Sequence, residues 1–273
     1  MKALRQVVCS LFAAASFLDS PVSATSFSTD QSDLYFIPSE SGWGMQLVQR
    51  GSVIFATLFV YDPANPTWYT ATMDFTSNST WTGVLYATTG TDFRVPWNPA
   101  NLTVTPVGTM TWTSTSVANG TLTYVVNGVT VVKNVTRQTL VLDDFSGLFG
   151  GVIQQTVTGC TNTALNGPAT LAGGWLISQS ADAVSMQTDF QEVISETAPE
   201  IACTYAGTLS QAGQMGALGP VPFTCSDGSM GSISLSRLQV TPYAISGSFV
   251  ASYSNPQGCQ SSGGFGGGKG ATF

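Results

Sequence analysis

Carboxylates and tryptophans are the side chains of this sequence that could do chemistry, because its 273 residues include no histidine. The lack of histidine excludes Ser-His-Asp and Cys-His triads, histidine metal sites and histidine acid–base catalysis at neutral pH. Four candidate carboxylates lie among those of the tryptophan-rich first half: Glu40, Asp62, Asp74 and Asp92. Two carboxylates beside aromatic platforms are what glycoside hydrolysis requires, with one protonating the leaving oxygen and the other attacking or activating water.

Structural roles compete with this catalytic interpretation. Asp62 precedes Pro63 and is well placed to accept hydrogen bonds in a turn. Glu40 and Asp92 fall in predicted loops, and Asp74 falls on the polar face of a predicted strand. No spacing indicates that two of these carboxylates converge, so a structural role is favoured for each and no catalytic residue is predicted.

Tryptophans are dense in the same half of the chain, where five of the six occur: Trp43, Trp68, Trp81, Trp97 and Trp112. Aromatic faces stack on sugars and other flat ligands, and a few polar groups beside them fix the ligand's orientation. Trp68, Trp81 and Trp112 fall in predicted strands, where core packing is favoured. Trp43 between two glycines and Trp97 between prolines in a long loop are the better binding candidates, and Trp68 is kept as a third.

Cations are scarce, which makes Arg94 and Arg137 further candidates for contact with an anionic group of a ligand. A salt bridge to one of the many carboxylates is the default role of each. The formal net charge is −7 at pH 7, so nucleic acid and anionic membranes are not expected partners. Only 8% of the residues are charged, against about a quarter in ordinary soluble domains. A surface of hydroxyls and amides suits proteins outside the cytoplasm and proteins that pack against copies of themselves.

The first 24 residues have the pattern of a secretory signal peptide. Lys2 and Arg5 form a basic start, residues 7–18 are mostly apolar, and residues 22–24 form a small-residue cleavage site. The apolar core is too short to span a bilayer, which needs about 20 residues, and no later apolar run is long enough. We therefore expect an exported protein, periplasmic or extracellular, with no transmembrane segment.

Four cysteines follow this leader: Cys160, Cys203, Cys225 and Cys259. An even number behind a signal peptide predicts disulfides in an oxidising compartment. Of three possible connectivities, Cys203 with Cys225 is favoured because the segment between them is predicted to fold as a hairpin that is symmetric about Gln214. Cys160 would then pair with Cys259. Metal ligation is disfavoured because no Cys-x-x-Cys spacing occurs, and neither a cofactor nor a metal is predicted.

Strands and tight turns account for nearly the whole pattern of the first domain, residues 25–142. Apolar alternation predicts strands near 34–37, 44–49, 53–61, 67–75, 81–88, 102–114, 120–126 and 130–140. Asn127-Gly128 is a strong two-residue hairpin signal because both turn positions need positive φ. The strand at 53–61 is apolar on both alternating faces, so we expect it to be covered on both sides. Residues 25–33 are expected to be loose.

A change of composition predicts a second domain, residues 143–273, which contains the four cysteines. Its strands are expected near 147–158, 174–178, 184–188, 201–211, 221–225, 231–240 and 245–253. A phase slip of the apolar residues predicts a bulge near Arg237. Residues 189–196 are the one candidate for a helical turn, and the glycine-rich tail at 261–270 is predicted to be flexible. The fold class is therefore all-β, with two antiparallel modules that are either meander barrels or sandwiches.

Three motifs of the first half resemble a pattern of uncharacterised secreted β-rich proteins of Gram-negative bacteria: Glu-Ser-Gly-Trp-Gly at 40–44, Ile-Phe-Ala-Thr-Leu-Phe-Val-Tyr-Asp at 54–62 and Pro-Thr-Trp at 66–68. The segments 203–207 and 225–228 are similar to a domain that often follows this pattern. The resemblance covers most of the chain after the leader and implies a secreted bacterial protein. That family has no established activity, so the resemblance assigns no functional residue.

Three functions follow from these observations, in order of preference. The first is an exported, non-catalytic binding or surface-associated protein that contacts a glycan, a polymer or a small ligand through exposed tryptophans. The second is a structural protein that self-associates through its strand edges, which a low surface charge would permit. The third is a carboxylate-dependent glycoside hydrolase, which needs two carboxyl groups about 5–10 Å apart across one cleft.

Overall fold

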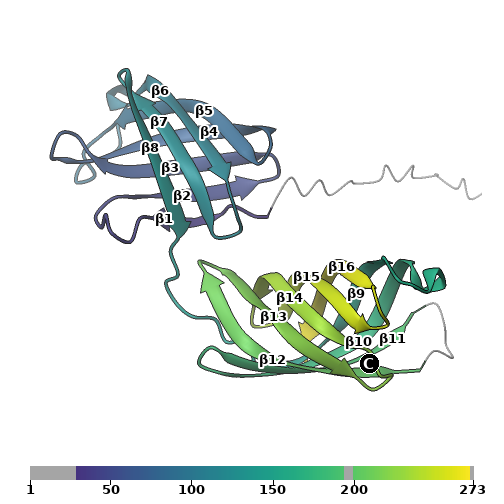
Figure 1. Ribbon diagram of the computed structural model, residues 1–273. Coiled ribbons are helices and arrows are strands. Elements are labelled where there is room, and N and C mark those ends of the chain that lie inside the picture. Colours follow the sequence, from purple (N-terminus) through teal and green to yellow (C-terminus); the bar gives the residue numbers. More distant parts are fainter. Residues whose placement is uncertain (1–28, 194–198, 271–273) are drawn as a thin grey trace, which may run out of the picture.

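Alternating apolar residues and short turns build two closed antiparallel β-barrels, which follow one another along the chain (Figure 1). A computed structural model describes residues 29–193 and 199–270, so the predicted signal peptide lies outside the described residues. The first barrel consists of β1 (Asp33–Phe36), β2 (Gly44–Arg50), β3 (Val53–Tyr61), β4 (Pro66–Ser77), β5 (Thr80–Thr89), β6 (Thr103–Ser114), β7 (Asn119–Val126) and β8 (Val129–Arg137). Each strand pairs with the next, and β8 pairs with β1. The barrel alternative was therefore correct and the sandwich was wrong.

Large apolar side chains fill the first barrel. Trp81, Trp112 and Ile54 are fully buried, as predicted for the two tryptophans. Gln31 closes one end of this core, because it is only 1% exposed and its side-chain oxygen accepts a hydrogen bond of 3.2 Å from the indole N–H of Trp112. This part of the chain is packed, so the prediction of a loose segment at 25–33 was wrong for its described residues.

The outer face of β3 is apolar and exposed, which corrects the expectation that this strand is covered on both sides. Phe55, Phe59 and Tyr61 point outward and are 47%, 46% and 55% exposed. A barrel wall is a single sheet with one interior, so its outward residues are buried only where another element packs on them. Nothing in the described part of the chain buries these three side chains.

The second barrel has the same plan as the first and is closed by the pairing of its last strand with its first. It consists of β9 (Gly147–Thr158), β10 (Gly167–Ser180), β11 (Ala183–Glu192), β12 (Ile201–Ala212), β13 (Met215–Cys225), β14 (Met230–Val240), β15 (Ala244–Asn255) and β16 (Gln260–Lys269). Two single 3₁₀ turns, η1 (Pro99–Asn101) and η2 (Thr163–Leu165), lie in the β5–β6 and β9–β10 loops. In the described residues, no helix has the length and apolar character needed to cross a membrane.

Local irregularities of the strands follow the turn and bulge signals of the sequence. Asn127 and Gly128 have φ of 49° and 84° in the hairpin between β7 and β8, which confirms the predicted turn. The register of β14 against β15 shifts beside Arg237, whose φ is 54°, so the predicted bulge is confirmed. The predicted helical turn at 189–196 was wrong where it is described, because β11 continues to Glu192.

The glycine-rich tail forms strand β16, so the prediction of a flexible segment at 261–270 was wrong. This strand pairs with β15 on one side and with β9 on the other, and the second pairing closes the barrel. Glycine is required at one position by close approach, because a Cβ on Gly263 would lie 2.0 Å from the carbonyl oxygen of Gln154. Composition alone indicated flexibility, whereas hydrogen bonds to two neighbouring strands fix this backbone.

Two disulfides cross-link the second barrel with the predicted connectivity. Cys203 lies directly opposite Cys225 in the β12–β13 pair, and the two are bonded. Cys160 is bonded to Cys259. The favoured pairing was correct because the hairpin centred near Gln214 brings its two ends together.

The turn between β12 and β13 connects the two barrels. The backbone N–H of Gln214 donates to the Asp33 carboxylate at 3.0 Å, and its side-chain amide donates to the Ser32 carbonyl at 2.7 Å. Next to it, the backbone N–H of Gly213 donates to the Thr139 hydroxyl at 3.0 Å. One end of the second barrel therefore faces the first barrel, and the end that carries both disulfides faces away from it (Figure 1).

Gly263→Ala should destabilise the second barrel by about 1–3 kcal/mol, because overpacking forces the backbone to shift where the new Cβ meets the Gln154 carbonyl. Gly264→Ala is the matched control, since its Cβ would make an ordinary contact, 3.5 Å from the Gly247 carbonyl oxygen. Urea unfolding of the oxidised protein, followed by near-ultraviolet circular dichroism, measures both. Equal unfolding midpoints for the two variants would contradict the close approach of β16 to β9.

Candidate functional site

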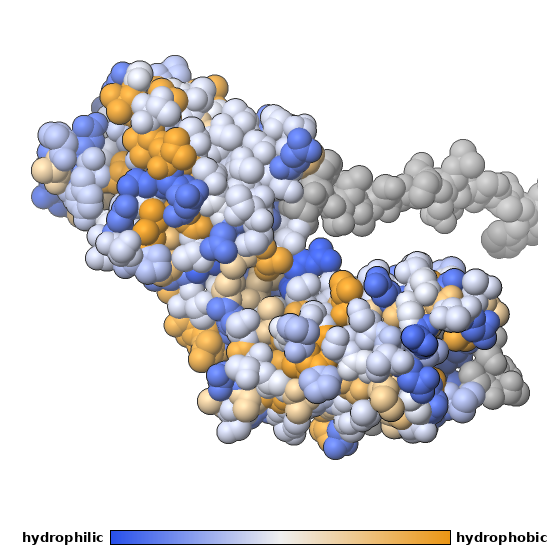
Figure 2. All heavy atoms as spheres, in the orientation of Figure 1, coloured by the Kyte–Doolittle hydropathy of each residue, from blue (hydrophilic) through white to orange (hydrophobic). Residues whose placement is uncertain are grey.

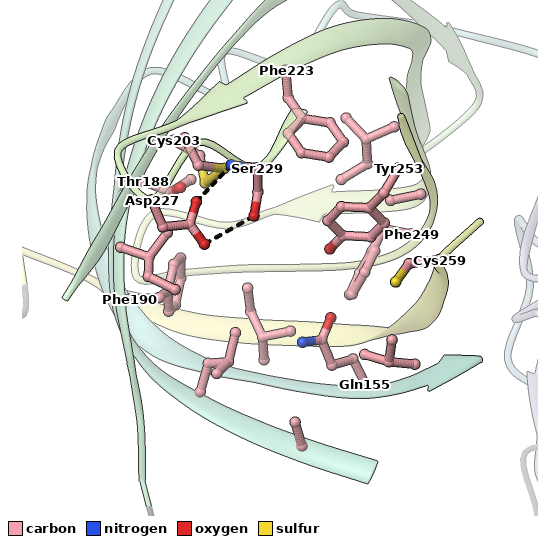
Figure 3. A pocket seen from close by; sticks show the side chains of 18 of the residues that line it. Gln155, Thr188, Phe190, Cys203, Phe223, Asp227, Ser229, Phe249, Tyr253 and Cys259 are labelled. Atoms are coloured by element: carbon pink, nitrogen blue, oxygen red, sulfur yellow. Dashed lines mark hydrogen bonds between the residues drawn. A yellow bond between two sulfur atoms is a disulfide. The ribbon is translucent and has the colours of Figure 1, made fainter. Parts of the chain in front are cut away.

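The interior of the second barrel is hollow, in contrast to that of the first. A cavity of about 560 Å³ occupies it, and Figure 3 shows side chains from several strands around this space. Inward residues such as Ile153 and Tyr205 are only partly buried, whereas Ile54, Ala56 and Leu58, which face inward from β3, have no exposed surface. Leu165 and Asp227, in loops at the end far from the first barrel, also line the cavity. The cavity therefore opens at that end.

Small residues occupy inward positions on β15 and β16, and Ala251 among them lines the cavity. Ala251 and Ser261 lie opposite each other, with Gly263 one inward position further along β16. Large side chains would otherwise fill a barrel of eight strands at these positions. Nearer to the first barrel the space beside a glycine is occupied, because a Cβ on Gly267 would lie 2.7 Å from the Trp175 ring. The wide part of the cavity therefore lies toward the open end.

Aromatic rings make up much of the cavity wall, and they come from six strands: Trp175, Phe190, Tyr205, Phe223, Phe249, Tyr253 and Phe265. The centroids of the Trp175 and Phe190 rings are 4.9 Å apart, and those of Phe223 and Tyr253 are 5.2 Å apart, both edge to face. Such contacts restrict the rings to one arrangement. The wall is therefore a preformed apolar surface of the kind that small-molecule sites have.

A few polar groups interrupt this apolar wall. The Tyr253 hydroxyl lies 3.3 Å from the Ser261 hydroxyl, and the buried Thr188 forms a hydrogen bond with Tyr205. Burial raises the pKa of the Tyr205 phenol, which this hydrogen bond partly opposes, so the phenol is neutral at physiological pH. Gln155 lies beside the cavity (Figure 3), and its side-chain amide has no hydrogen-bond partner among the described residues.

Two carboxylates stand at the mouth of the cavity. Glu192, at the end of β11, and Asp227, in the turn between β13 and β14, both line it. The Asp227 carboxylate is held in place by hydrogen bonds of 2.9 Å from the backbone N–H and the hydroxyl of Ser229, which Figure 3 shows as dashed lines. Among the described residues that line the cavity there is neither a lysine nor an arginine.

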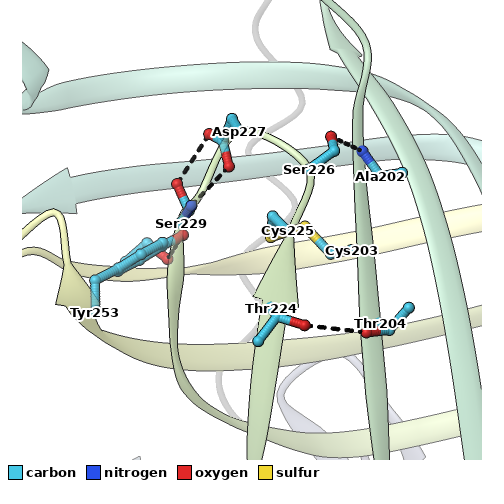
Figure 4. Close-up of a disulfide and its surroundings, with 10 residues drawn as sticks. Ala202, Cys203, Thr204, Thr224, Cys225, Ser226, Asp227, Ser229 and Tyr253 are labelled. Atoms are coloured by element: carbon cyan, nitrogen blue, oxygen red, sulfur yellow. Dashed lines mark hydrogen bonds between the residues drawn. A yellow bond between two sulfur atoms is a disulfide. The ribbon is translucent and has the colours of Figure 1, made fainter.

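Both disulfides lie at this mouth. Cys203–Cys225 joins β12 to β13 (Figure 4), and Cys160–Cys259 joins the β9–β10 loop to the β15–β16 loop. Three of these four cysteines line the cavity: Cys203, Cys225 and Cys259. These cross-links hold the rim in one arrangement, and a rim that is already ordered reduces the entropic cost of binding a ligand.

Sequence patterns did not reveal this cavity. The available signal was the alternation in the glycine-rich tail, where every second residue faces inward and two of these are Ser261 and Gly263. That signal has meaning only once the tail is known to be a strand, and the composition of the tail indicated a flexible segment. Tyr253 and Gln155 were part of no predicted motif, and Tyr205 lies in the motif at 203–207, to which no function was assigned.

The predicted binding tryptophans lie on the first barrel, away from the cavity. Trp97 and Trp68 are 63% and 57% exposed. Core packing was the wrong prediction for Trp68, because it points outward from β4. Trp43 is half-buried: its indole N–H donates to Glu40 at 2.9 Å, and Lys133 Nζ lies 5.5 Å from its ring centroid. Trp43 is therefore not an open stacking platform.

Trp68 belongs to an exposed aromatic face on the first barrel. It lies directly opposite Phe59 in the β3–β4 pair, and Tyr61 is exposed two residues further along β3. Figure 2 shows apolar groups on the surface of this barrel. Trp97 belongs to the β5–β6 loop, where its ring lies beside Gly90. The structure thus places Trp68 with Phe59 and leaves Trp97 on a separate loop.

Three of the four carboxylates considered for catalysis, Glu40, Asp62 and Asp92, have partners of other kinds. Glu40 accepts a hydrogen bond of 2.7 Å from Lys133 and one from an indole N–H, and these lower the pKa of its carboxyl group. Asp62 accepts a hydrogen bond of 3.2 Å from the Tyr69 hydroxyl. In the described part of the chain, no hydrogen bond joins one of the four candidate carboxylates to another.

Both candidate arginines form salt bridges, which was their default role. Arg94 pairs with Asp92 on the surface, and its hydrogen bonds lower the pKa of that carboxyl group. The Arg137 side chain has no exposed surface; it pairs with Asp33 at 3.1 Å and donates to the Val117 carbonyl at 2.7 Å and to two further carbonyls. An anionic ligand from solvent therefore has no access to this guanidinium.

Comparison with known proteins finds no matching family model and no similar curated sequence. Function is therefore inferred from the residues and their geometry. The resemblance of the first-half motifs to secreted bacterial proteins stays a prediction. The disulfides are the observed feature that bears on location, since disulfides persist in oxidising compartments.

Arg137→Ala should lower the free energy of unfolding by about 3–5 kcal/mol, because it leaves the largely buried Asp33 carboxylate without its cation and three part-buried carbonyls without this donor. Arg94→Ala is the matched control, an arginine whose ion pair lies on the surface, and its urea midpoint should equal that of the wild type. Equilibrium unfolding in urea measures both. Similar midpoint losses for the two variants would show that the buried contacts of Arg137 do not stabilise the first barrel.

Proposed function

We propose that the chain is an exported, non-catalytic binding protein that holds a small, mostly apolar ligand inside its second barrel. The observation that carries this proposal is the contrast between the two interiors. Both barrels have eight strands, yet the first is filled by side chains and the second encloses a cavity of about 560 Å³. A protein that needed only a stable second barrel would gain from filling that space, since empty volume is destabilising.

Size and chemistry of the cavity support a small-molecule ligand. Ligand sites commonly have volumes of about 300–1,000 Å³, mostly apolar walls and a small number of polar groups that fix orientation. The cavity has such a volume, aromatic walls, and the polar groups of Gln155, Tyr205 and Tyr253. The disulfides at the mouth keep the entrance formed in the absence of ligand. Export is supported by the same disulfides and by the predicted leader, and the site of action is the periplasm or the outside of the cell.

A second candidate function is contact with a glycan or a polymer at the exposed aromatic face of the first barrel. The specific observation is the pair Phe59 and Trp68, adjacent on β3 and β4 and about half exposed. Thr57 and Thr70 are paired on the same two strands, two residues away, and offer hydroxyl groups beside the rings. Rings flanked by hydroxyls are suited to stacking on sugars.

The other two functions have less support. Self-association through strand edges requires unpaired edges, and each described strand of both barrels has a neighbour on both sides. Hydrolysis requires two carboxyl groups that face one cleft, and Glu40, Asp62 and Asp92 are each bonded to a cation or a hydroxyl. We therefore propose neither as the function of the chain.

Binding inside the second barrel is tested with N-phenyl-1-naphthylamine, a neutral apolar dye whose fluorescence rises on leaving water. Ile153→Trp adds bulk to the cavity and should weaken dye binding at least about tenfold, while Val152→Trp, on the outer face of the same strand, should bind like the wild type. Fluorescence titration gives the dissociation constants. Near-ultraviolet circular dichroism confirms that each variant is folded, and Ala251→Phe is a second filling variant should the first not fold. Equal affinity in filled and control variants would refute binding in the lumen.

Contact with a polysaccharide at the aromatic face is tested by affinity electrophoresis through gels that contain soluble polysaccharides. Trp68→Ala should weaken the apparent affinity for the polysaccharide about tenfold, because an aromatic stacking contact is worth about 1–1.5 kcal/mol. The apparent affinity is obtained from the retardation of the protein at several polysaccharide concentrations. Phe93→Ala is the control, since Phe93 is 94% exposed but lies on the β5–β6 loop. A polysaccharide that retards the wild type and the Trp68 variant equally would rule out this face as the binding surface.

A further inference from the structure

The second barrel has a strong excess of negative charge. Residues 143–273 contain eight carboxylates and only two cations, Arg237 and Lys269. The guanidinium of Arg237 donates to the Ser248 hydroxyl at 2.7 Å. Lys269 lies at the end of β16, with Nζ 5.6 Å from the centroid of the Phe149 ring. Neither cation lines the cavity, so neither is placed to bind an anionic group of a ligand there.

The mouth of the cavity is acidic. Glu192 faces inward from the last position of β11, opposite Leu171 in the β10–β11 pair, and no ion pair engages it in the described residues. Asp227 also lines the mouth, from the β13–β14 turn, where Ser229 orients its carboxylate. Glu200, close in sequence to the mouth, adds a further carboxylate but does not line the cavity. The potential at the opening is therefore negative, and a cavity with low-dielectric walls concentrates such a field.

The wall below these carboxylates suits the body of the same ligand. Its rings are apolar, and the face of an aromatic ring also attracts a cation. Tyr205, Tyr253 and Gln155 are neutral groups that leave the interior without a positive charge. A ligand with an alkyl or aromatic body inside the barrel could therefore carry a cationic head at the rim. An anionic head would find no cation at the rim or in the interior.

We propose that the ligand of the second barrel is a cationic amphiphile, with its apolar body in the lumen and a protonated amine at the mouth beside Glu192 and Asp227. This inference rests on the proposed binding function and specifies its ligand class. A carboxylate-headed ligand such as a fatty acid would meet two carboxylates and no cation. A neutral ligand would use the lumen but would gain nothing from the acidic mouth.

The experiment compares three ligands that share one chain and differ in the head: decylamine, decanol and decanoate, each below the concentration at which it forms micelles. Each is used to displace N-phenyl-1-naphthylamine from the oxidised protein at pH 7 and low ionic strength. We expect decylamine to displace the dye at concentrations about tenfold lower than decanol, and decanoate to be the weakest. Raising the salt concentration should narrow the difference between the amine and the alcohol, because the carboxylates at the mouth are accessible to solvent.

The double variant Glu192→Gln and Asp227→Asn tests the assignment to these two residues. It should bring decylamine and decanol to the same affinity, because only the amine uses the carboxylates. Glu200→Gln is the matched control, which removes an exposed carboxylate outside the cavity and should keep the preference for the amine. Each substitution retains the shape of the side chain and one acceptor oxygen. With Asp227→Asn, the amide oxygen can accept from the Ser229 N–H and the amide NH₂ can donate to the Ser229 hydroxyl, so the turn keeps two hydrogen bonds.

The outcomes separate this inference from the proposed function. No binding of the dye to the wild type would overturn the lumen site itself. Dye binding with equal displacement by all three ligands, or stronger displacement by decanoate, would leave the lumen site standing and overturn the cationic ligand. An amine preference that survives the double variant would overturn the role of Glu192 and Asp227.

Discussion

Closure of each sheet into a barrel is the constraint on which the rest of this structure depends. Closure pairs both edges of every strand and divides the side chains into one interior set and one exterior set. With eight strands the interior is just wide enough to be filled by large side chains. The first barrel is filled, with Trp81 and Trp112 fully buried. The second has Ala251, Ser261 and Gly263 at inward positions and encloses a cavity. The same topology thus has an interior filled by side chains in one module and an interior with a cavity in the other.

The sequence predicted the features that local chemistry decides. The Asn127-Gly128 turn needs positive φ at both residues, and the hairpin between Cys203 and Cys225 brings its ends together for a disulfide. Features that closure decides were missed. The tail at 261–270 looks flexible by composition but becomes a strand because β9 and β15 both offer it partners. The outer face of β3 looks buried by pattern, but no described residue covers it. The cavity could not be predicted from local turn chemistry or from apolar patterns. It depends on which residues of several strands lie at the same level of the barrel.

The junction between the barrels decides which end of the second one is available. From the turn between β12 and β13, Gln214 bonds to the first barrel and Gly213 bonds to Thr139 in the segment that follows β8. At that end, large rings such as that of Trp175 also occupy the space beside inward glycines. At the other end the disulfides join neighbouring strands and loops without blocking the opening. Among the described residues, the opening at this end is where a ligand would enter, past the carboxylates at the rim.

Charge divides the two modules as sharply as packing does. Lys133, Arg94 and Arg137 in the first barrel each pair with a carboxylate, so they neutralise charge where the chain is structural. At the mouth of the second barrel, Glu192 and Asp227 form no ion pair with any described residue. Removing a carboxylate from water without a partner is costly, which keeps these groups at the rim, where water solvates them, and out of the aromatic lumen. The lumen then favours a ligand with an apolar body, and the rim favours a head group of positive charge. A cavity that was merely a packing defect would have no reason to show both properties at one opening.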